Sequence, residues 1–323
     1  MTGFKRFLAV AAIAVAGIAA ATYASYKAEL KRARDNVPSG LLARLPGGSI
    51  EYEVKGDGIP LLSIHGAGGG YDQGLANAAD LVGPGFRVIA PSRFGYLRTP
   101  VPADFSTAAQ ADAHAGLLAE LRIPRVVVVG VSAGARSALE FAIRHPDKVS
   151  ALILIVPGTY SPGDPVSIED SRGSRFAFWL VNNGADFAWW AAAKIAPATL
   201  IRFTGTPPGL VAVSSPAEQA RVRAMVRNIL PLSQRFAGIQ LDSNPDARPP
   251  RFEQVAAPTL VISARDDLFN TLPAATYAAG EIAGARLTVY ETGGHLLVGR
   301  QSEVRAQIRD FLARHVPEAR RNP

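Results

Sequence analysis

Residues 126–134 read VVVVGVSAG, four consecutive valines that lead into the pattern Gly-x-Ser-x-Gly. The valine run is typical of a strand that is buried on both faces. The pattern around Ser132 is that of a nucleophile elbow, in which the glycines permit a strained turn between a strand and a helix. A helix-like segment follows as far as residue 145. An ordinary strand-to-helix turn is the alternative, but this context favours Ser132 as a nucleophile.

A glycine-rich loop follows another apolar run upstream, in LLSIHGAGGG at residues 61–70. Its spacing does not fit the dinucleotide-binding motif G-x-G-x-x-G, because Tyr71 stands where the last glycine would be. The loop is better suited to presenting backbone amides to a developing oxyanion. We expect the amides of Ala67 and Ala133 to form this oxyanion hole and His65 to be structural.

A serine nucleophile needs a base, and the base needs an acid that orients it. A predicted strand at residues 258–264 runs into Asp266 and Asp267, and His295 follows the last predicted strand. Serine, aspartate, histidine is the chain order of enzymes with a nucleophile elbow. We therefore expect His295 to be the base and one of the two aspartates to be the acid. If neither serves, the first alternative is Asp164, in the loop after the preceding predicted strand.

The other histidines fit structural or solvated roles, because His114, His145 and His315 lie on or beside helical patterns. No histidine or carboxylate spacing suggests a metal site, so we expect no metal and no cofactor. The sequence has no cysteine, which excludes disulfides, cysteine-ligated zinc, iron–sulfur clusters and thiol catalysis.

Short apolar runs alternate with helical patterns through most of the chain, which predicts an α/β fold with a mostly parallel, doubly wound sheet. The predicted strands cover residues 49–54, 60–65, 86–90, 125–130, 151–156, 258–264 and 286–290, and the predicted helices 106–122, 133–145, 271–283 and 302–314. The alternation lapses after residue 158 in a stretch that holds all three tryptophans. The predicted organisation is an N-terminal hydrophobic helix in residues 1–36, a core in 37–158 and 253–323, and a helical cap inserted at 159–252.

The N-terminal segment carries no charged residue from position 7 to position 26. A helix of this length would reach about 30 Å, roughly the thickness of the hydrocarbon core of a bilayer. We expect residues 7–26 to be a membrane anchor, followed by a linker at 37–48. A signal peptide cleaved after the small residues 19–21 is the main alternative, and a buried or surface helix is the third. Basic residues flank both sides, and their larger number after the anchor leans toward a cytoplasmic body.

The net charge of +7 does not indicate a nucleic-acid partner. The surplus of basic residues lies in segments 1–36 and 300–323, and the body between them has equal numbers of basic and acidic residues. A neutral body offers no basic patch that could follow a phosphate backbone. The expected partners are a small, hydrophobic substrate and, through residues 7–26, a membrane.

Residues from about 49 to 314 resemble the capped α/β-hydrolases of the serine hydrolase branch. The resemblance is carried by the His65-Gly66 loop, the elbow at Ser132, RHPDKVSALIL after it, the cap insertion, PTLVISARDD and GGH. In this family the acid usually stands where Asp267 stands. A serine nucleophile, rather than an aspartate, argues against haloalkane dehalogenases and epoxide hydrolases. The glycine-rich loop is similar to loops of C–C bond hydrolases and proline iminopeptidases, but Leu296 stands where the C–C hydrolases typically have an aromatic residue.

These observations predict a membrane-tethered serine hydrolase, most simply a carboxylic-ester hydrolase, with the triad Ser132, Asp267 and His295. Aromatic residues in the predicted cap suggest an apolar substrate. An acyltransferase, a C–C bond hydrolase or an aminopeptidase would keep the same triad. A non-catalytic binding module would normally have lost a member of it. Substrate identity depends on cap and loop geometry, which the sequence does not specify.

Overall fold

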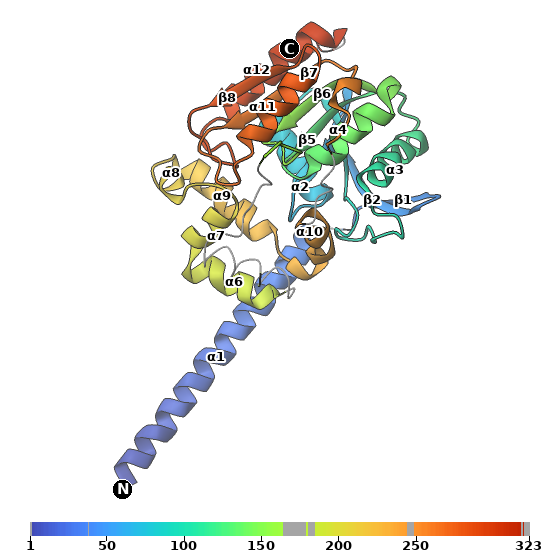
Figure 1. Cartoon of the computed structure of the whole chain (residues 1–323). Coiled ribbons are helices and arrows are strands. Elements are labelled where there is room, and N and C mark those ends of the chain that lie inside the picture. The colour runs from blue at the N-terminus through green and yellow to red at the C-terminus, as the bar shows by residue number, and fades with distance from the viewer. Residues whose placement is uncertain are drawn as a thin grey trace.

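The structure is a computed structural model that describes residues 2–37, 39–163, 179, 185–243, 249–317 and 319. Its centre is an eight-stranded sheet in the order β1-β2-β4-β3-β5-β6-β7-β8 (Figure 1). The strands are β1 (Leu41–Leu45), β2 (Gly48–Lys55), β3 (Ile59–Ile64), β4 (Phe86–Pro91), β5 (Val126–Val131), β6 (Val149–Ile155), β7 (Thr259–Ala264) and β8 (Arg286–Tyr290). β2 pairs antiparallel with β1 and β4, and the other pairs are parallel. The predicted fold class is confirmed.

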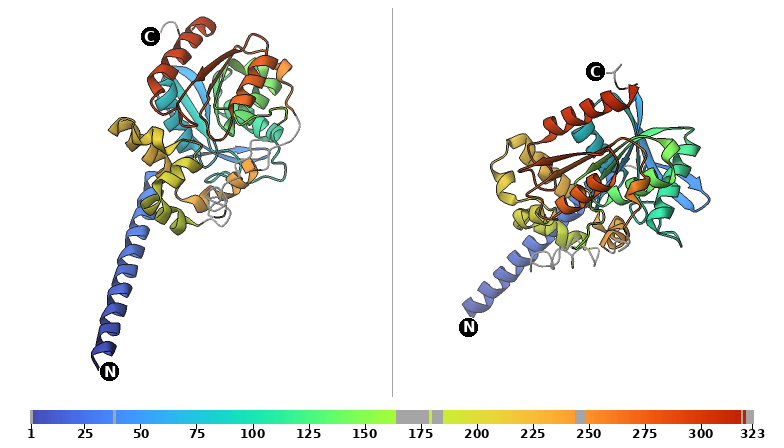
Figure 2. Two further views of the ribbon diagram at one scale, coloured as in Figure 1. Left: turned by 60° about the vertical axis from the view of Figure 1, so that its left-hand side comes forward. Right: turned by 45° about the horizontal axis from the view of Figure 1, so that its top comes forward.

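The valine run of β5 shows why this sheet carries helices on both faces. Val126 and Val128 pack into one apolar cluster and Val127 and Val129 into another, because successive side chains of a strand point to opposite faces. One face is covered by α3 (Thr107–Glu120), α4 (Gly134–Arg144) and α11 (Leu272–Glu281), and the other by the π-helical turn η1 (Ala78–Val82) and α12 (Gln301–His315). The four predicted helices are thus confirmed, and Figure 2 shows them as layers around the sheet.

Two of the elements that the sequence does not predict lie close to the candidate site or to the N-terminal segment. β1 pairs with β2 across a turn at Pro46 and Gly47, so the proline and glycine that suggest a linker instead close a hairpin. The prediction of a linker at 37–48 is therefore wrong for this part. The second element is the short helix α2 (Tyr71–Asn77), which begins directly after the glycine-rich loop. Seven residues are too few to show a clear helical period.

The cap helices lie between β6 and β7 in the chain. They are α6 (Asp186–Ile195), α7 (Pro197–Phe203), α8 (Pro208–Ala212), α9 (Pro216–Asn228), η3 (Leu232–Gln234) and α10 (Phe236–Ser243). They enclose an apolar cluster of their own around the fully buried Trp189, whose indole N–H donates to the carbonyl of Val226 at 3.1 Å. Tyr96 of the core joins this cluster. Phe176 and Phe178 of the predicted aromatic region lie outside the described residues.

The N-terminal helix α1 (Thr2–Asn36) has 35 residues, which gives it a length of about 52 Å. Within the described chain it is the one helix long and apolar enough to cross a membrane, a property that anchors and signal sequences share. Its first turns expose large apolar side chains and project away from the body (Figure 1). Its last turns pack on the cap: Leu30 is buried, and the Tyr26 ring lies 5.2 Å from that of Phe187 and 5.7 Å from that of Trp190.

Candidate active site

Ser132 lies at the turn between β5 and α4 with a φ of +53°, a conformation that non-glycine residues rarely adopt. Its N–H donates to the Ile155 carbonyl at 2.9 Å, which holds the turn against the end of β6. The glycines of the motif have a packing reason. A Cβ at Gly130 would lie 2.5 Å from that of Ala138, and a Cβ at Gly134 would lie 2.7 Å from the Ile64 carbonyl oxygen. The sequence thus forces a tight elbow that presents Ser132 at the carboxyl edge of the sheet.

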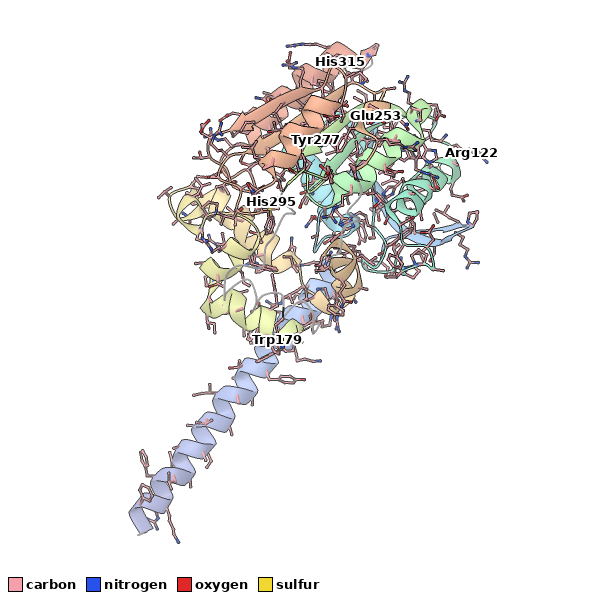
Figure 3. The ribbon with its side chains drawn as sticks, in the orientation of Figure 1. Arg122, Trp179, Glu253, Tyr277, His295 and His315 are labelled. Atoms are coloured by element: carbon pink, nitrogen blue, oxygen red, sulfur yellow. The ribbon has the colours of Figure 1, made fainter. Side chains whose placement is uncertain are left out.

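His295 joins Ser132 to Asp267. Its Nε2 lies 2.8 Å from Ser132 Oγ, and its Nδ1 lies 2.8 Å from Asp267 Oδ2. The Asp267 carboxylate is fully buried and also accepts hydrogen bonds from the Phe269 amide and the Thr271 hydroxyl. These contacts fix the carboxylate toward Nδ1, so the Nδ1–H is donated to Asp267 and Nε2 accepts from the serine hydroxyl. Figure 3 shows His295 where the sheet domain meets the cap.

Asp266 has a different set of partners. Its two carboxylate oxygens accept the amides of Gly293 at 3.2 Å and Gly294 at 2.7 Å, directly before His295. Asp266 therefore braces the loop that carries His295 and does not touch the imidazole. The alternative acid Asp164 lies outside the described residues.

Gly205, in the cap loop after α7, is a site residue that the sequence analysis missed. Its carbonyl accepts the amides of both Leu268 at 2.9 Å and His295 at 3.1 Å. Its φ is +74°, and a Cβ here would lie 2.7 Å from the Cβ of His295 and 2.7 Å from the Phe269 ring. Only glycine fits this position, which links the cap to the loops of His295 and Asp267. No sequence signal marks it, because one glycine among many carries no pattern.

The amides of Ala67 and Ala133 are both available to a ligand. Neither N–H donates a hydrogen bond to any residue that the structure describes. Ala133 follows Ser132, and the loop of Ala67 adjoins Ser132, because a Cβ at Gly66 would lie 3.1 Å from the Cβ of Ser132. The helix α2 holds the glycine-rich loop in place, because Oε1 of its residue Gln73 accepts a hydrogen bond from the Gly66 amide at 2.9 Å.

Two buried ion pairs clamp this loop between core and cap. Arg235 of the cap is fully buried, donates to the Gly69 carbonyl and pairs with Asp72 of α2 at 2.8 Å. Arg93 of the core donates to the His65 carbonyl at 3.0 Å and pairs through both terminal nitrogens with Asp242 of the cap. Paired and hydrogen-bonded charges are the form in which ions tolerate burial.

Tyr96 completes the clamp. Its hydroxyl donates to Asp242 and accepts the Gly68 amide at 3.2 Å. Burial and the Asp242 carboxylate raise the pKa of Tyr96 well above its usual value, so the hydroxyl stays protonated and able to donate. Burial opposes ionisation of Asp242, but Arg93 together with its other partners outweighs burial and lowers the pKa of this carboxyl.

The other histidines take the structural or surface positions that we expect from the sequence. His65 is buried and neutral: its Nε2 accepts the Arg93 amide at 2.9 Å, so Nδ1 carries the proton and donates to the Gly66 carbonyl. Burial, followed by the charge of Arg93, lowers the pKa of His65 well below its usual value. Burial lowers the pKa of His114 to about 3. In the described parts of the chain, no group of three or more histidine, cysteine or acidic residues is placed to hold a metal ion.

Comparisons with known proteins agree with this architecture. A family model described as the alpha/beta hydrolase fold matches residues 59–299. The chain is 29% identical over 253 residues to the 2-hydroxy-6-oxo-6-phenylhexa-2,4-dienoate hydrolase of Comamonas testosteroni, covering 76% of this chain and 84% of that protein. A solved α/β-hydrolase fold protein from Nakamurella multipartita superposes with a TM-score of 0.68 at 25% identity, covering 87% and 99% of the two chains. A bacterial membrane phospholipase A superposes with a TM-score of 0.63 at 22% identity, covering 100% of both.

Proposed function

Because this chain belongs to the α/β-hydrolase fold family, we propose that it is a serine hydrolase with Ser132 as nucleophile, His295 as base and Asp267 as acid. One observation carries the proposal. An unbroken chain of hydrogen bonds runs from Asp267 through both ring nitrogens of His295 to Ser132 Oγ, with 2.8 Å at each link to the imidazole. This is the relation that nucleophile, base and orienting acid need for acyl transfer.

In the proposed reaction, Ser132 Oγ attacks the substrate carbonyl carbon while His295 Nε2 takes the hydroxyl proton. Asp267 accepts the Nδ1–H, which keeps Nε2 free to act as a base and stabilises the imidazolium that forms. His295 then gives its proton to the leaving group. A water molecule, deprotonated by His295, attacks the acyl-enzyme and regenerates Ser132.

We assign the oxyanion hole to the amides of Ala67 and Ala133. Two unpaired amides beside a nucleophile are what a tetrahedral intermediate requires, because they stabilise its negative oxygen without reorganisation. The clamp formed by Arg235, Arg93 and Tyr96 fixes the loop that presents the Ala67 amide. In this proposal the buried ion pairs keep the Ala67 amide in a fixed position for the oxyanion.

We propose an ester as the bond that is cleaved. An alkoxide leaving group needs one proton, which His295 can deliver, and His295 is the one ionisable group of the described chain that hydrogen-bonds to Ser132. The second candidate is C–C bond cleavage, favoured by the similarity to the Comamonas testosteroni hydrolase over most of both chains. That reaction must also protonate a carbon atom.

We further propose that residues 7–26 anchor the enzyme in a membrane. The exposed apolar side chains along the first turns of α1 support this, because a large contiguous apolar surface marks interaction with lipid or protein. The match to a membrane phospholipase A extends over the entire chain, α1 included. A signal peptide cleaved after residues 19–21 is the competing proposal. It would also keep Tyr26 and Leu30 on the cap, so the packing of the end of α1 fits both proposals.

A substrate panel tests the bond class. The full-length protein in detergent is offered p-nitrophenyl esters of increasing chain length and, in parallel, 2-hydroxy-6-oxo-6-phenylhexa-2,4-dienoate, with Ser132→Ala as the control. We expect turnover of the esters, with a preference for longer acyl chains, and its loss in the control. Faster turnover of the dienoate than of every ester would replace the ester assignment by C–C hydrolysis. Ester turnover that survives in the control would refute the nucleophile.

A further inference from the structure

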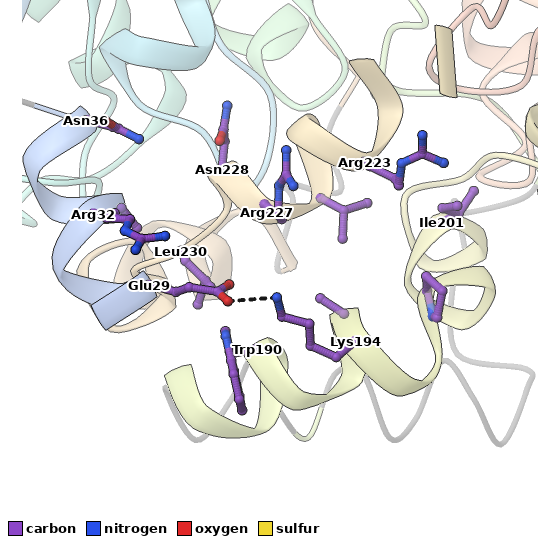
Figure 4. Close-up of a pocket in the computed structure, with 14 residues that line it drawn as sticks. Glu29, Arg32, Asn36, Trp190, Lys194, Ile201, Arg223, Arg227, Asn228 and Leu230 are labelled. Atoms are coloured by element: carbon purple, nitrogen blue, oxygen red, sulfur yellow. Dashed lines mark hydrogen bonds and ion pairs between the residues drawn. The ribbon is translucent and has the colours of Figure 1, made fainter. Parts of the chain in front are cut away.

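A cavity of about 440 Å³ opens between the last turns of α1 and the cap (Figure 4), and its lining contains neither Ser132 nor His295. α1 contributes Glu29, Arg32 and Asn36 to its wall. Lys194 of α6 and Arg223 and Arg227 of α9 complete the charged part of the lining. Four basic side chains and one carboxylate therefore face one cavity, a surplus of three positive charges.

The positive charges of the three arginines are not balanced by acidic side chains in the described part of the chain. Lys194 and Glu29 satisfy each other, with 2.7 Å between Nζ and Oε1. Arg32, Arg223 and Arg227 form no ion pair with any residue in the described ranges, and Arg223 has only a 3.4 Å hydrogen bond to Gln219. Arginine is suited to phosphate and carboxylate groups, because its planar fork donates two parallel hydrogen bonds. The cavity is thus arranged to take an anion.

The rest of the wall is apolar. Trp190, Ile201, Val226 and Leu230 line the cavity beside the charged groups, and the Lys194 ammonium lies 5.8 Å from the centre of the Trp190 ring. A free inorganic ion would gain nothing from these side chains. An amphipathic ligand, with an anionic head and a hydrocarbon portion, would use both parts of the wall.

The position along α1 identifies the source of such a ligand. If the uncharged run ends at Tyr26, Glu29 lies about 4.5 Å and Arg32 about 9 Å beyond it along the helix axis. The polar layer of one leaflet is about 5–8 Å thick. Tyr26 also packs on Phe187 and Trp190, and tyrosine and tryptophan are enriched at the boundary between lipid and water. Together these features put Glu29 close to the boundary of the hydrocarbon and Arg32 at the outer edge of the headgroup layer, so the cavity opens where the phosphate groups lie.

We propose that this cavity binds a phosphate group, supplied by the headgroup of an anionic phospholipid next to α1, and thereby seats the cap on the membrane surface. The inference rests on the membrane attachment proposed above. Arg32 and Arg227 pair with the phosphate, and the apolar wall receives the start of an acyl chain. This lipid is a bound ligand at a distance from the triad and is not cleaved.

The test uses the full-length protein in a neutral maltoside detergent. Native mass spectrometry with added phosphatidylglycerol measures retained lipid, and calorimetric titration with inorganic phosphate measures the free ion. The test variant is Arg32→Gln/Arg227→Gln, and Arg34→Gln/Arg202→Gln is the matched control. The control removes the same charge from exposed positions of α1 and α7 that do not line the cavity.

We expect one phosphatidylglycerol to be retained per chain and its affinity to fall by about tenfold or more in the test variant but not in the control. Phosphate titration should show the same ranking with weaker binding. Phosphate binding without lipid retention would keep the anion site and overturn the lipid as its source. An equal loss of lipid affinity in both variants would overturn the site, because it would show that the total positive charge, and not this cavity, attracts the lipid. Unchanged binding in the test variant would refute the site.

Failure of this inference is separable from failure of the proposed function. Neither arginine touches the triad, so ester turnover and the melting temperature should stay unchanged in both variants. If the protein is a hydrolase without this site, turnover is present and lipid retention is absent. If it has the site but no esterase activity, the reverse result appears.

Discussion

Asp266 and Asp267 are neighbours in the chain, but their carboxylates contact different groups. Asp267 accepts the Nδ1–H of His295, whereas Asp266 accepts the amides of Gly293 and Gly294. Asp267→Asn should lower kcat/KM for an ester about ten-thousand-fold, because an amide in this position favours the wrong imidazole tautomer. Asp266→Asn keeps one amide oxygen for the loop and should cost less than about tenfold, an effect of loop position alone. Steady-state kinetics of both variants decide the matter, and the reverse ranking would move the acid to Asp266.

We expect the buried imidazole of His114 to make the stability of the folded protein depend on pH. It is fully buried on α3, and neither ring nitrogen has a hydrogen-bond partner among the described residues. In the unfolded chain its imidazole takes up a proton below about pH 6.5, but in the folded protein its pKa is about 3. Stability is therefore lost as the pH falls through 6.5, and His114 accounts for about 2 kcal/mol of the loss between pH 7.5 and pH 5.

His114→Leu should remove this part of the pH dependence. The melting temperatures of wild type and variant are compared at pH 7.5 and pH 5 in the same detergent. We expect a smaller difference between the two pH values in the variant, while His315→Leu, at an exposed position of α12, behaves as wild type. An unchanged difference in His114→Leu would show that this imidazole titrates normally in the folded state.

At the scale of elements, the joint between cap and core passes through the loop of Gly205. Gly205→Ala would place a methyl group 2.7 Å from the Cβ of His295 and force a residue with a side chain to adopt a φ of +74°. Displacement of His295 should lower kcat about 10- to 100-fold with little change in KM, because general base catalysis depends on placement. Gly209→Ala is the matched control, since no atom lies within 4 Å of its added Cβ. Equal activity of both variants would show that the cap does not position the base.

The two halves of α1 should respond differently to deletion. Removing residues 2–22 takes away most of the exposed apolar surface but keeps Tyr26, Leu30 and the ion pair of Glu29 with Lys194. This shortened protein should no longer need detergent and should keep its melting temperature. Removing residues 2–37 also uncovers the cap and should lower the melting temperature by about 5–10 °C. Equal melting temperatures of the two proteins would mean that the end of α1 does not stabilise the body.

At the scale of the whole molecule, the cap lies between the sheet and the projecting part of α1 (Figures 1 and 2). The loops after β3, β5, β7 and β8 all begin at the carboxyl edge of the sheet, which is where α/β folds place their ligands. In the proposed function, the anchor, the cap and the triad therefore occupy one side of the protein. A substrate that partitions into the membrane would reach Ser132 from that side.

The features that could be predicted from the sequence are those that a pattern of neighbouring residues determines. The valine run predicts β5, and the elbow motif predicts the strained turn at Ser132, since both are written in consecutive residues. The hairpin of β1 is missed because Pro46 and Gly47 serve linkers and turns equally well. Contacts between distant segments leave no local pattern. Arg235 and Asp72 are 163 positions apart, and their pairing becomes visible only in the folded chain.

Labelling with a fluorophosphonate probe tests the central claim most directly, because the probe reacts with an activated serine and requires no knowledge of the substrate. The full-length protein, Ser132→Ala and His295→Gln are treated in parallel and examined by intact mass and peptide mapping. We predict one probe per chain on the peptide that contains Ser132, slow labelling of His295→Gln, and no labelling of Ser132→Ala, whose ester turnover falls about a million-fold. Labelling at another residue, or ester turnover that persists in Ser132→Ala, would contradict the assignment of the nucleophile.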